Sequence, residues 1–292
     1  MKLTGTGKAG ATTGISVAPF AAASGGRQRL ETGSHVNVNG VFGLVGVAVR
    51  KDFETAGLTC GGFFEFGSAN LKTHNSFSTG DVNGNGNSNY RGGGLLARLD
   101  LTATTLRGLY VESSIRLGRI SNDWHTNDIV DAVSGKRAEL DLSYHYYGAH
   151  LGLGYLLKAS DSITFDIYSK VLWSRLNSKE TKVADDQYTF DAINSWRTRV
   201  GTKVDFTLTK TVSLYTGAAW EHEFDGDARG RVSVATISYD VPSPSTGGNS
   251  AVIDLGVSFN NPIPGLTLGL GATGYLGDRR GVTGNLNFRY AF

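Results

Sequence analysis

Cysteine, methionine and proline are scarce in this 292-residue chain, which holds one Cys, one Met and five Pro. The single Cys60 leaves no partner for an intramolecular disulfide, and no Cys/His cluster has the spacing of a zinc site. No apolar run approaches the twenty or so residues of a membrane-spanning helix, and the mean hydropathy is -0.16. Disulfide-stabilised scaffolds, zinc proteins and helical membrane proteins are therefore excluded.

An excess of one charge is also missing, because 28 Lys and Arg stand against 26 Asp and Glu. A chain so close to neutral has no electrostatic preference for nucleic acid. No residue pattern predicts a binding site for a cofactor or a metal ion. The opening residues 1–14 contain Lys2 and Lys8 but no apolar segment, so they do not form a secretory signal. If the protein is exported, we expect the signal to precede Met1.

Glycine is abundant, with 40 residues, and apolar and polar residues alternate with a period of two from about residue 14 to the end. In the last segment Val282, Leu286 and Phe288 share one face, whereas Thr283 and Asn285 share the other. Residues 251–259, 266–276, 196–208, 163–173 and 109–117 repeat this arrangement. The alternation predicts an all-β protein.

Twelve strands are expected, near residues 14–29, 35–50, 57–71, 90–102, 106–121, 138–157, 161–176, 192–208, 212–224, 250–260, 265–276 and 281–292. Short connections alternate with mostly longer, polar ones at 72–89, 122–137, 177–191 and 225–249. This alternation is typical of an antiparallel up-and-down transmembrane β-barrel, whose short turns and termini face the periplasm. The even count lets the first and last strands pair antiparallel.

Four features complicate the pattern. The apolar phase reverses before Tyr147, for which a β-bulge is the expected cause. Residues 229–240 resemble a strand but would make the count odd, so we expect a hairpin in the longest outer loop. The run from Asn83 to Asn89 is interpreted as a flexible loop tip. Pro19 weakens the first strand because it lacks a backbone donor.

The polar strand face carries charges of both signs, which would line a wet lumen in a barrel. The inward candidates are Glu65, Arg98, Asp100, Glu112, Arg116, Asp141, Asp166, Lys170, Arg197, Arg199, Lys203, Asp205, Glu221, Glu223, Asp254 and Arg289. A soluble β-sandwich is the alternative, in which this face is simply solvated. The apolar face is thin, Gly-rich and aromatic toward the strand ends, which favours lipid over a second sheet.

Several segments in order resemble autotransporter β-domains: residues 19–27 and 32–38 at the start, then 219–224, 255–257, 271–277 and the closing 285–292. The resemblance covers about residues 14–292. It implies a monomeric translocator barrel of type V secretion in the outer membrane of a Gram-negative bacterium, without catalytic residues. It also implies insertion by the barrel assembly machinery through a terminal aromatic signal formed by Phe288, Tyr290 and Phe292.

Family members export an N-terminal passenger, which this sequence does not contain, so we interpret the chain as a fragment, an excised domain or a degenerate reading frame. Residues 1–13 are then a linker remnant, a truncated part of the pore plug. Some relatives cleave the passenger at an Asn-Asn pair in the pore. The only such pair here, Asn260-Asn261, lies in a late turn and gives no support for cleavage.

Other motifs give only weak indications of a nucleotide-binding, catalytic or calcium-binding site. Gly269 to Gly274 matches a dinucleotide fingerprint but opens no helix, so barrel glycines explain it better. His222 and His125 lie near acidic residues as in outer-membrane proteases, yet no catalytic geometry can be fixed. Asp225, Asp227 and Asp240 lack an EF-hand spacing. A passengerless pore or a surface-loop adhesin remains the alternative function.

Overall fold

The computed structural model describes residues 14–78, 80–103, 105–132, 134–183, 186–234, 237–241 and 243–292. The linker remnant expected at 1–13 lies outside these residues. Across the described part of the chain all regular structure is β-strand. None of it is a helix long and apolar enough to cross a membrane.

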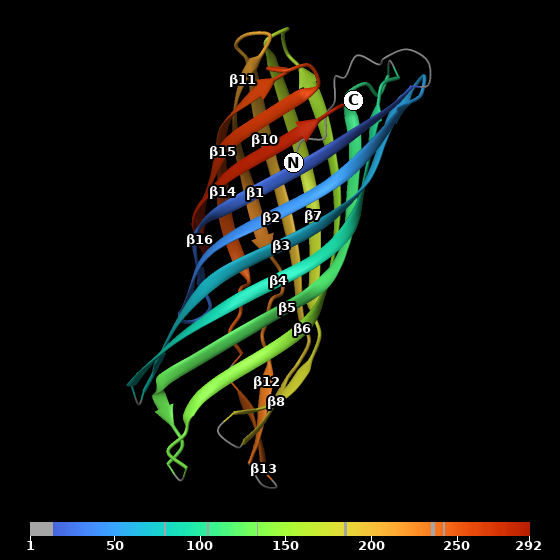
Figure 1. Ribbon diagram of the computed structural model, residues 1–292. Coiled ribbons are helices and arrows are strands. Elements are labelled where there is room, and N and C mark those ends of the chain that lie inside the picture. Colours follow the sequence, from blue (N-terminus) through green and yellow to red (C-terminus); the bar gives the residue numbers. More distant parts are fainter. Residues whose placement is uncertain are drawn as a thin grey trace.

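Twelve strands close into one antiparallel barrel (Figure 1). They are β1 (Ile15–Glu31), β2 (His35–Asp52), β3 (Ala56–Phe77), β4 (Gly80–Leu101), β5 (Leu109–Val130), β6 (Arg137–Lys158), β7 (Ile163–Leu176), β10 (Ile193–Thr207), β11 (Val212–Glu223), β14 (Gly248–Asn260), β15 (Leu266–Gly277) and β16 (Arg279–Tyr290). Each pairs with the barrel strands before and after it. The predicted twelve-stranded up-and-down barrel is confirmed.

Closure is made by β1 and β16, whose register runs from Phe20 opposite Arg289 to Leu30 opposite Arg279. Pro19 lies one residue before this register and is matched only on the β2 side, where it faces Val47. A proline at this place leaves the β1–β16 ladder intact, which explains why it is tolerated in the first strand.

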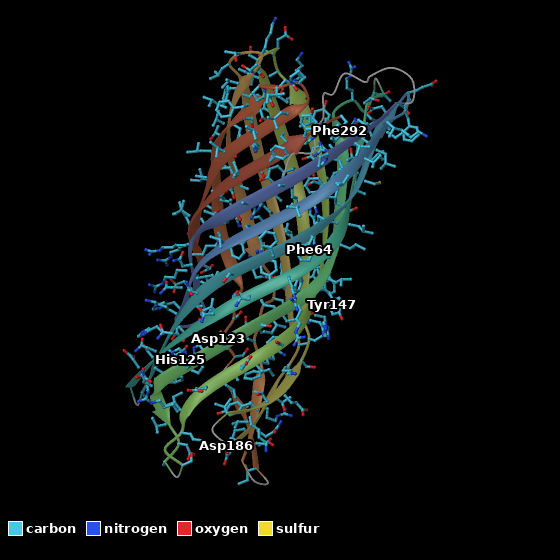
Figure 2. The ribbon with its side chains drawn as sticks, in the orientation of Figure 1. Phe64, Asp123, His125, Tyr147, Asp186 and Phe292 are labelled. Carbon is cyan, nitrogen blue, oxygen red and sulfur yellow. The ribbon has the colours of Figure 1, made fainter. Side chains whose placement is uncertain are left out.

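The two ends of the barrel differ. Short connections at 53–55, 159–162, 208–211 and 261–265 lie at the same end as residue 14, whose carbonyl accepts from the N–H of Asp52 at 3.1 Å, and as Phe292 (Figure 2). At the opposite end, β8 (Lys179–Val183), β9 (Asp186–Phe190), β12 (Gly230–Val234) and β13 (Ile237–Val241) form a separate four-stranded sheet. The predicted hairpin at 229–240 is therefore confirmed as an extra-barrel element. We call the two ends the turn end and the loop end.

Strands β3 to β6 each hold 22 residues, about 70 Å of extended chain. A membrane crossing needs only about 9–11 residues, so these strands continue well past an apolar layer. The interpretation of Asn83 to Asn89 as a loop tip is wrong: these residues pair with β3 on one side, and Gly84 to Asn89 also pair with β5 on the other. Cross-strand partners on both sides turned a polar, Gly-rich run into sheet.

The bulge predicted before Tyr147 is also wrong. The β5–β6 register continues without a shift from Leu109 opposite Tyr155 to His125 opposite Glu139, and its irregularity lies beyond, between His125 and Val130. Leu142 is buried in the barrel, whereas Asp141 is exposed on the outer face, contrary to its predicted inward position. The apparent phase reversal arises because β6 leaves the lipid layer there and its outer face becomes polar.

The outer face of the barrel carries most of the exposed large apolar side chains (Figure 2). Phe64 and Tyr147 lie at mid-height, and Phe292 lies near the turn end. Asp123 and His125 lie nearer the loop end. The apolar layer with polar rims is the surface that a bilayer requires. We call this layer the apolar belt.

Leu151 and Asp141 provide a matched test of the belt, because both lie on the outer face of β6, ten residues apart. Leu151 is 59% exposed. Leu151→Arg should lower the free energy of unfolding in lipid bilayers by about 2–4 kcal/mol, because the charge enters hydrocarbon. Asp141→Arg should cause no loss. Denaturant titration in vesicles measures both, and an equal response of the two variants would contradict the assignment of the belt.

Candidate functional site: the polar interior of the barrel

Charged side chains on the inner face contact one another across strands that are not neighbours. Tyr110 on β5 donates to Asp166 on β7 at 2.8 Å, and Arg116 on β5 reaches Glu65 on β3 at 3.4 Å. In each pair another strand lies between the partners. Such contacts form only on the concave side of a closed sheet. The interior is thus a connected polar network rather than a packed apolar core.

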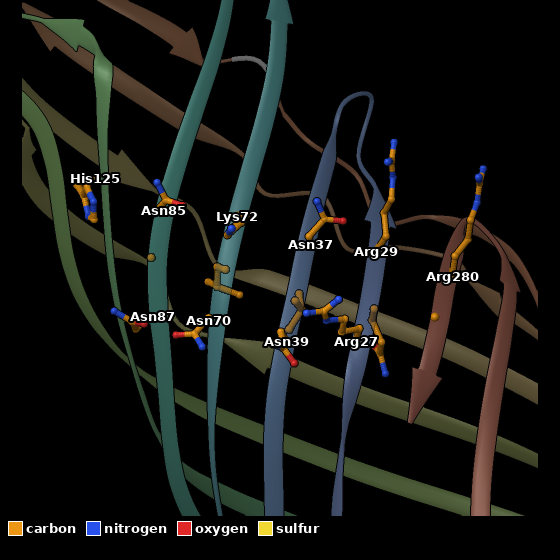
Figure 3. A pocket seen from close by; sticks show the side chains of 15 residues that line it. Arg27, Arg29, Asn37, Asn39, Asn70, Lys72, Asn85, Asn87, His125 and Arg280 are labelled. Atoms are coloured by element: carbon orange, nitrogen blue, oxygen red, sulfur yellow. The ribbon is translucent and has the colours of Figure 1, made fainter. Parts of the chain in front are cut away.

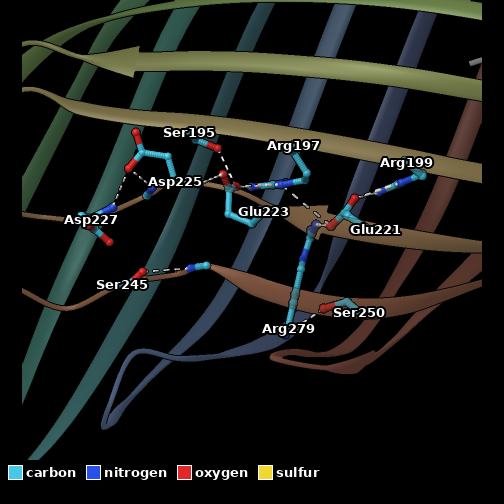
Figure 4. A network of polar contacts seen from close by, with 12 residues as sticks. Ser195, Arg197, Arg199, Glu221, Glu223, Asp225, Asp227, Ser245, Ser250 and Arg279 are labelled. Carbon is cyan, nitrogen blue, oxygen red and sulfur yellow. Dashed lines mark hydrogen bonds and ion pairs between the residues drawn. The ribbon is translucent and has the colours of Figure 1, made fainter.

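Near the loop end, Glu221 forms the centre of a cluster of arginines (Figure 4). Its carboxylate accepts from Arg199 at 2.5 Å and lies 3.2 Å from Arg279 on β16, with β14 and β15 between the two strands. Glu223 accepts from Arg197 at 3.0 Å and from the Ser195 hydroxyl at 2.6 Å. Both carboxylates are nearly inaccessible to solvent. We call these residues the Glu221 cluster.

A second group surrounds Glu65, which accepts a 2.7 Å hydrogen bond from the hydroxyl of Tyr146. The Tyr146 ring fits because Gly92 and Gly118 lie beneath it. A Cβ atom on Gly92 would come within 2.1 Å of the Tyr146 hydroxyl oxygen. Some of the abundant glycine of this chain therefore makes room inside the barrel for large polar side chains.

The third group joins Glu112 to three cationic or titratable side chains. Its carboxylate lies 2.5 Å from the amine of Lys170, 3.3 Å from Arg98 and 3.5 Å from His150. Arg98 also stacks on the ring of Tyr110, with 3.7 Å between the guanidinium carbon and the ring centroid. Because neighbouring charges are opposite in sign, this interior is neutralised locally.

The remaining predicted lumen residues also have partners. Lys203 lies over the ring of Tyr215 at 3.5 Å, and Arg289 is half-buried opposite Phe20. Arg50, Tyr146 and Arg279 also belong to these interior contacts, although the sequence pattern did not predict them. Arg50 and Arg279 stood at the limits of expected strands, and Tyr146 fell at the misjudged phase reversal. Extending the last expected strand by two residues would have found Arg279, and continuing one alternation through 138–157 would have found Tyr146.

Within the described residues, a cavity of about 650 Å³ opens at the loop-end half of the lumen, beside Glu65, Arg116 and the Glu221 cluster. Gly226, Pro244 and Thr246 of the connection between β11 and β14 line its other side. In this connection Asp227 accepts hydrogen bonds from Ser245 and Arg229, which hold the pKa of its carboxyl below the ordinary value. The loop residues therefore border the lumen directly.

The terminal aromatic residues lie on the outside of the turn end. Phe288 and Phe292 are exposed, the latter by 79%, and Tyr290 is half-exposed. The rings of Tyr290 and Phe292 meet edge to face at 4.9 Å, and the backbone N–H of Phe292 donates to the carbonyl of Val17 at 3.0 Å. The last residue thus contacts the strand that closes the barrel.

The histidine and glycine motifs noted in the sequence lie apart from one another. His222 stacks on Trp220 on the outer phase of β11 and bonds Asn249, whereas His125 lies on β5. In the described part of the chain no group of three or more His, Cys, Asp or Glu side chains could hold a metal ion. Gly269 to Gly274 lies inside β15.

The closed barrel, its apolar belt and its charged interior define an outer-membrane β-barrel. The model of the autotransporter β-domain family matches residues 19–273. The chain belongs to this family, as the sequence resemblance predicted. Translocator domains of this family are monomeric barrels in the outer membrane.

Solved autotransporter domains share the fold at low sequence identity. The β-domain of the Bordetella autotransporter BrkA aligns with a TM-score of 0.70 and 15% identity over 94% of this chain and 98% of that domain. The translocator domain of NalP from Neisseria meningitidis aligns with a TM-score of 0.66 and 16% identity, over 97% of this chain and 90% of that domain. The transport unit of AIDA-I from Escherichia coli aligns with a TM-score of 0.66 and 14% identity, over 100% of this chain and 93% of that unit. No curated protein sequence matches the chain.

Glu221→Gln should destabilise the barrel, because it leaves Arg199 and Arg279 without their shared counter-charge. The side chain of Glu221 is 4% exposed, and removing one partner of such a buried pair costs about 3 kcal/mol. Asp240→Asn, which breaks a solvent-exposed pair with Arg231, should cause no measurable change. The stabilities of the two variants are compared by denaturant titration, in which the loss of heat-modifiable migration in gel electrophoresis reports unfolding. Equal stabilities would mean that the Glu221 cluster does not hold the interior together.

Proposed function

We propose that this barrel anchors and exports a covalently linked N-terminal passenger through or beside its charged interior. The observation that carries the proposal is membership of the autotransporter family by a chain whose barrel closes around a polar network. Outer-membrane lipid surrounds the apolar belt, and the passenger would belong to a longer precursor. The chain itself contributes no catalytic step to this function.

Orientation follows from the two ends of the barrel. Short turns face the periplasm in outer-membrane barrels and longer loops face outward. Residue 14 and Phe292 both lie at the turn end, so both termini would be periplasmic. A polypeptide upstream of residue 14 would then start on the inner side of the membrane. It would then cross through or beside the lumen to reach the cell surface.

The lumen residues that support this role include Glu65, Arg98, Glu112, Arg116, Asp166, Lys170, Arg197, Arg199, Lys203, Glu221, Glu223 and Arg289. Charges of both signs hydrate a passing chain, and because they pair with one another, neither sign is in large excess. A translocating peptide of either charge would therefore find partners without being trapped at one site. We propose that these residues keep the translocation path through the lumen hydrated.

Fusion of a reporter ahead of Met1 tests export. The fusion would consist of a signal peptide, an epitope-tagged reporter and the full chain, in this order. Antibody labelling of intact cells would detect exposure of the reporter at the surface. We expect labelling with the barrel and none with a matched fusion lacking residues 266–292, which removes β15 and β16. A heat-modifiable barrel in the outer membrane with the reporter retained in the periplasm would contradict the proposal.

Phe288, Tyr290 and Phe292 support recognition of the last strand by the barrel assembly machinery, since an unpaired amphipathic strand can dock by β-augmentation before closure. Deleting Phe292 should lower the amount of folded barrel in the outer membrane severalfold. Phe224→Ala, which removes an exposed aromatic at the loop end, should not. Quantitative heat-modifiability of the membrane fraction measures this, and normal insertion without Phe292 would refute the assignment.

A further inference from the structure

A row of polar residues crosses six neighbouring strands on the outer face, toward the loop end of the barrel. The strand registers place these residues opposite one another in the order Arg280, Arg29, Asn37, Lys72, Asn85 and His125. A parallel row next to it holds Arg27, Asn39, Asn70 and Asn87, and ends on β5 at Asp123, whose carboxylate accepts from Asn87 at 3.0 Å. All of these side chains are exposed. Six strands at about 4.8 Å spacing make a row about 24 Å wide.

Together the two rows line a groove of about 670 Å³ on the outside of the barrel (Figure 3). We call it the outer groove. Four of its lining residues are Arg or Lys, five are Asn, and no Asp or Glu lines it. The whole chain carries 28 cationic against 26 acidic residues. The groove therefore concentrates positive charge in a nearly neutral protein.

The cations of the outer groove have few counter-charges among the described residues. Arg29 and Arg280 lie directly opposite on adjacent strands, an arrangement that destabilises a sheet unless an anion compensates. Glu31 does so in part, at 2.9 Å from Arg29 and 3.7 Å from Arg280. Within the described ranges, Arg27 and Lys72 have no carboxylate at ion-pair distance. The groove thus retains an excess of positive charge that an external anion can neutralise.

The groove adjoins the apolar belt on the same strand faces. Asn39 is followed two residues later on β2 by Val41, which is 65% exposed, and Arg280 is followed on β16 by Val282 at 56%. Two residues along a strand correspond to about 7 Å. The groove therefore lies where the hydrocarbon ends, at the depth of lipid headgroups.

We propose that the outer groove binds the phosphorylated saccharide headgroup of an outer-leaflet glycolipid, the lipid A portion of lipopolysaccharide. The inference rests on the proposed orientation, which puts the loop end outside the cell. Arginine and lysine match phosphate. The Asn side chains carry both donors and acceptors, as sugar hydroxyls and amides do. The acyl chains of such a lipid continue directly over the apolar belt.

This arrangement fits a lipid better than a soluble anion because cations and amides are spread along the membrane boundary instead of converging on one point. A single phosphate needs a few donors around one centre, whereas the longer of the two rows extends about 24 Å across six strands. Strands β1 to β4, which build most of the groove, are the first third of the barrel and rise past the belt. Bound headgroups would thus stabilise the parts of strands β1 to β4 that extend beyond the belt.

Binding of purified, refolded full-length barrel to vesicles containing bis-phosphorylated lipid A tests the proposal. The test variant is the triple substitution Arg27→Gln, Lys72→Gln, Arg280→Gln. Each cation near an anionic surface contributes about fivefold to affinity, so we expect a loss of about 100-fold. The matched control is Lys179→Gln, Arg229→Gln, Arg231→Gln, which removes three cations from the loop-end sheet and its connection. It should bind as the unaltered protein does.

Vesicles with dephosphorylated lipid A, vesicles with phosphatidylglycerol and free inorganic phosphate distinguish the sources of the anion. Preference for bis-phosphorylated lipid A, lost in the test variant alone, supports the proposal. Equal binding of dephosphorylated lipid A overturns it, and so does unchanged binding by the test variant. Equal affinity for phosphatidylglycerol would indicate a general anionic surface, and competition by inorganic phosphate a free-anion site; either result also overturns it.

Heat-modifiable migration confirms that both triple variants are folded before binding is measured. The reporter fusion separates this inference from the proposed function. If the unaltered barrel displays the reporter but shows no lipid A preference, the lipid site fails and export stands. If the reporter is not displayed while lipid A binding depends on the three cations, export fails and the site stands.

Discussion

Backbone hydrogen bonding in a medium without water is the constraint on which this structure depends. In hydrocarbon every exposed N–H and C=O costs several kcal/mol, so a β-protein can cross only as a sheet without edges. Here β1 and β16 satisfy that requirement by pairing over residues 20–30 and 279–289. Closure then dictates the rest: one face of each strand meets lipid and the other is enclosed.

Enclosure explains why so much charge is found inside a small barrel. Glu221 and Glu112 each gather several cations from different strands, because the concave face brings distant residues to one place. Glycine opposite Tyr146 and Tyr110 gives these large side chains their space. The same glycines weaken strand propensity, which the closed hydrogen-bond ladder compensates.

The asymmetry between the two sides of the barrel links fold to function. Strands β3 to β6 extend past the belt, and their outer faces change from apolar to polar as they leave it. Through this change the protein presents the outer groove at the membrane boundary and the lumen cavity behind it. A translocating chain and a surrounding lipid would therefore meet opposite faces of the same strands.

The sequence by itself determined the number of strands, their phase over the belt, the closure of an even-numbered barrel and the family, because period-two alternation is a local property that each strand carries in full. It missed the inward Tyr146 beside the expected phase reversal, and it misjudged Asn83 to Asn89 and Asp141, which lie where β4 and β6 continue beyond the lipid. There the outer face is polar, so alternation no longer marks a strand. Only the tertiary structure decided these lengths, the cross-lumen ion pairs and the outer groove, since all of them depend on register between strands far apart in sequence.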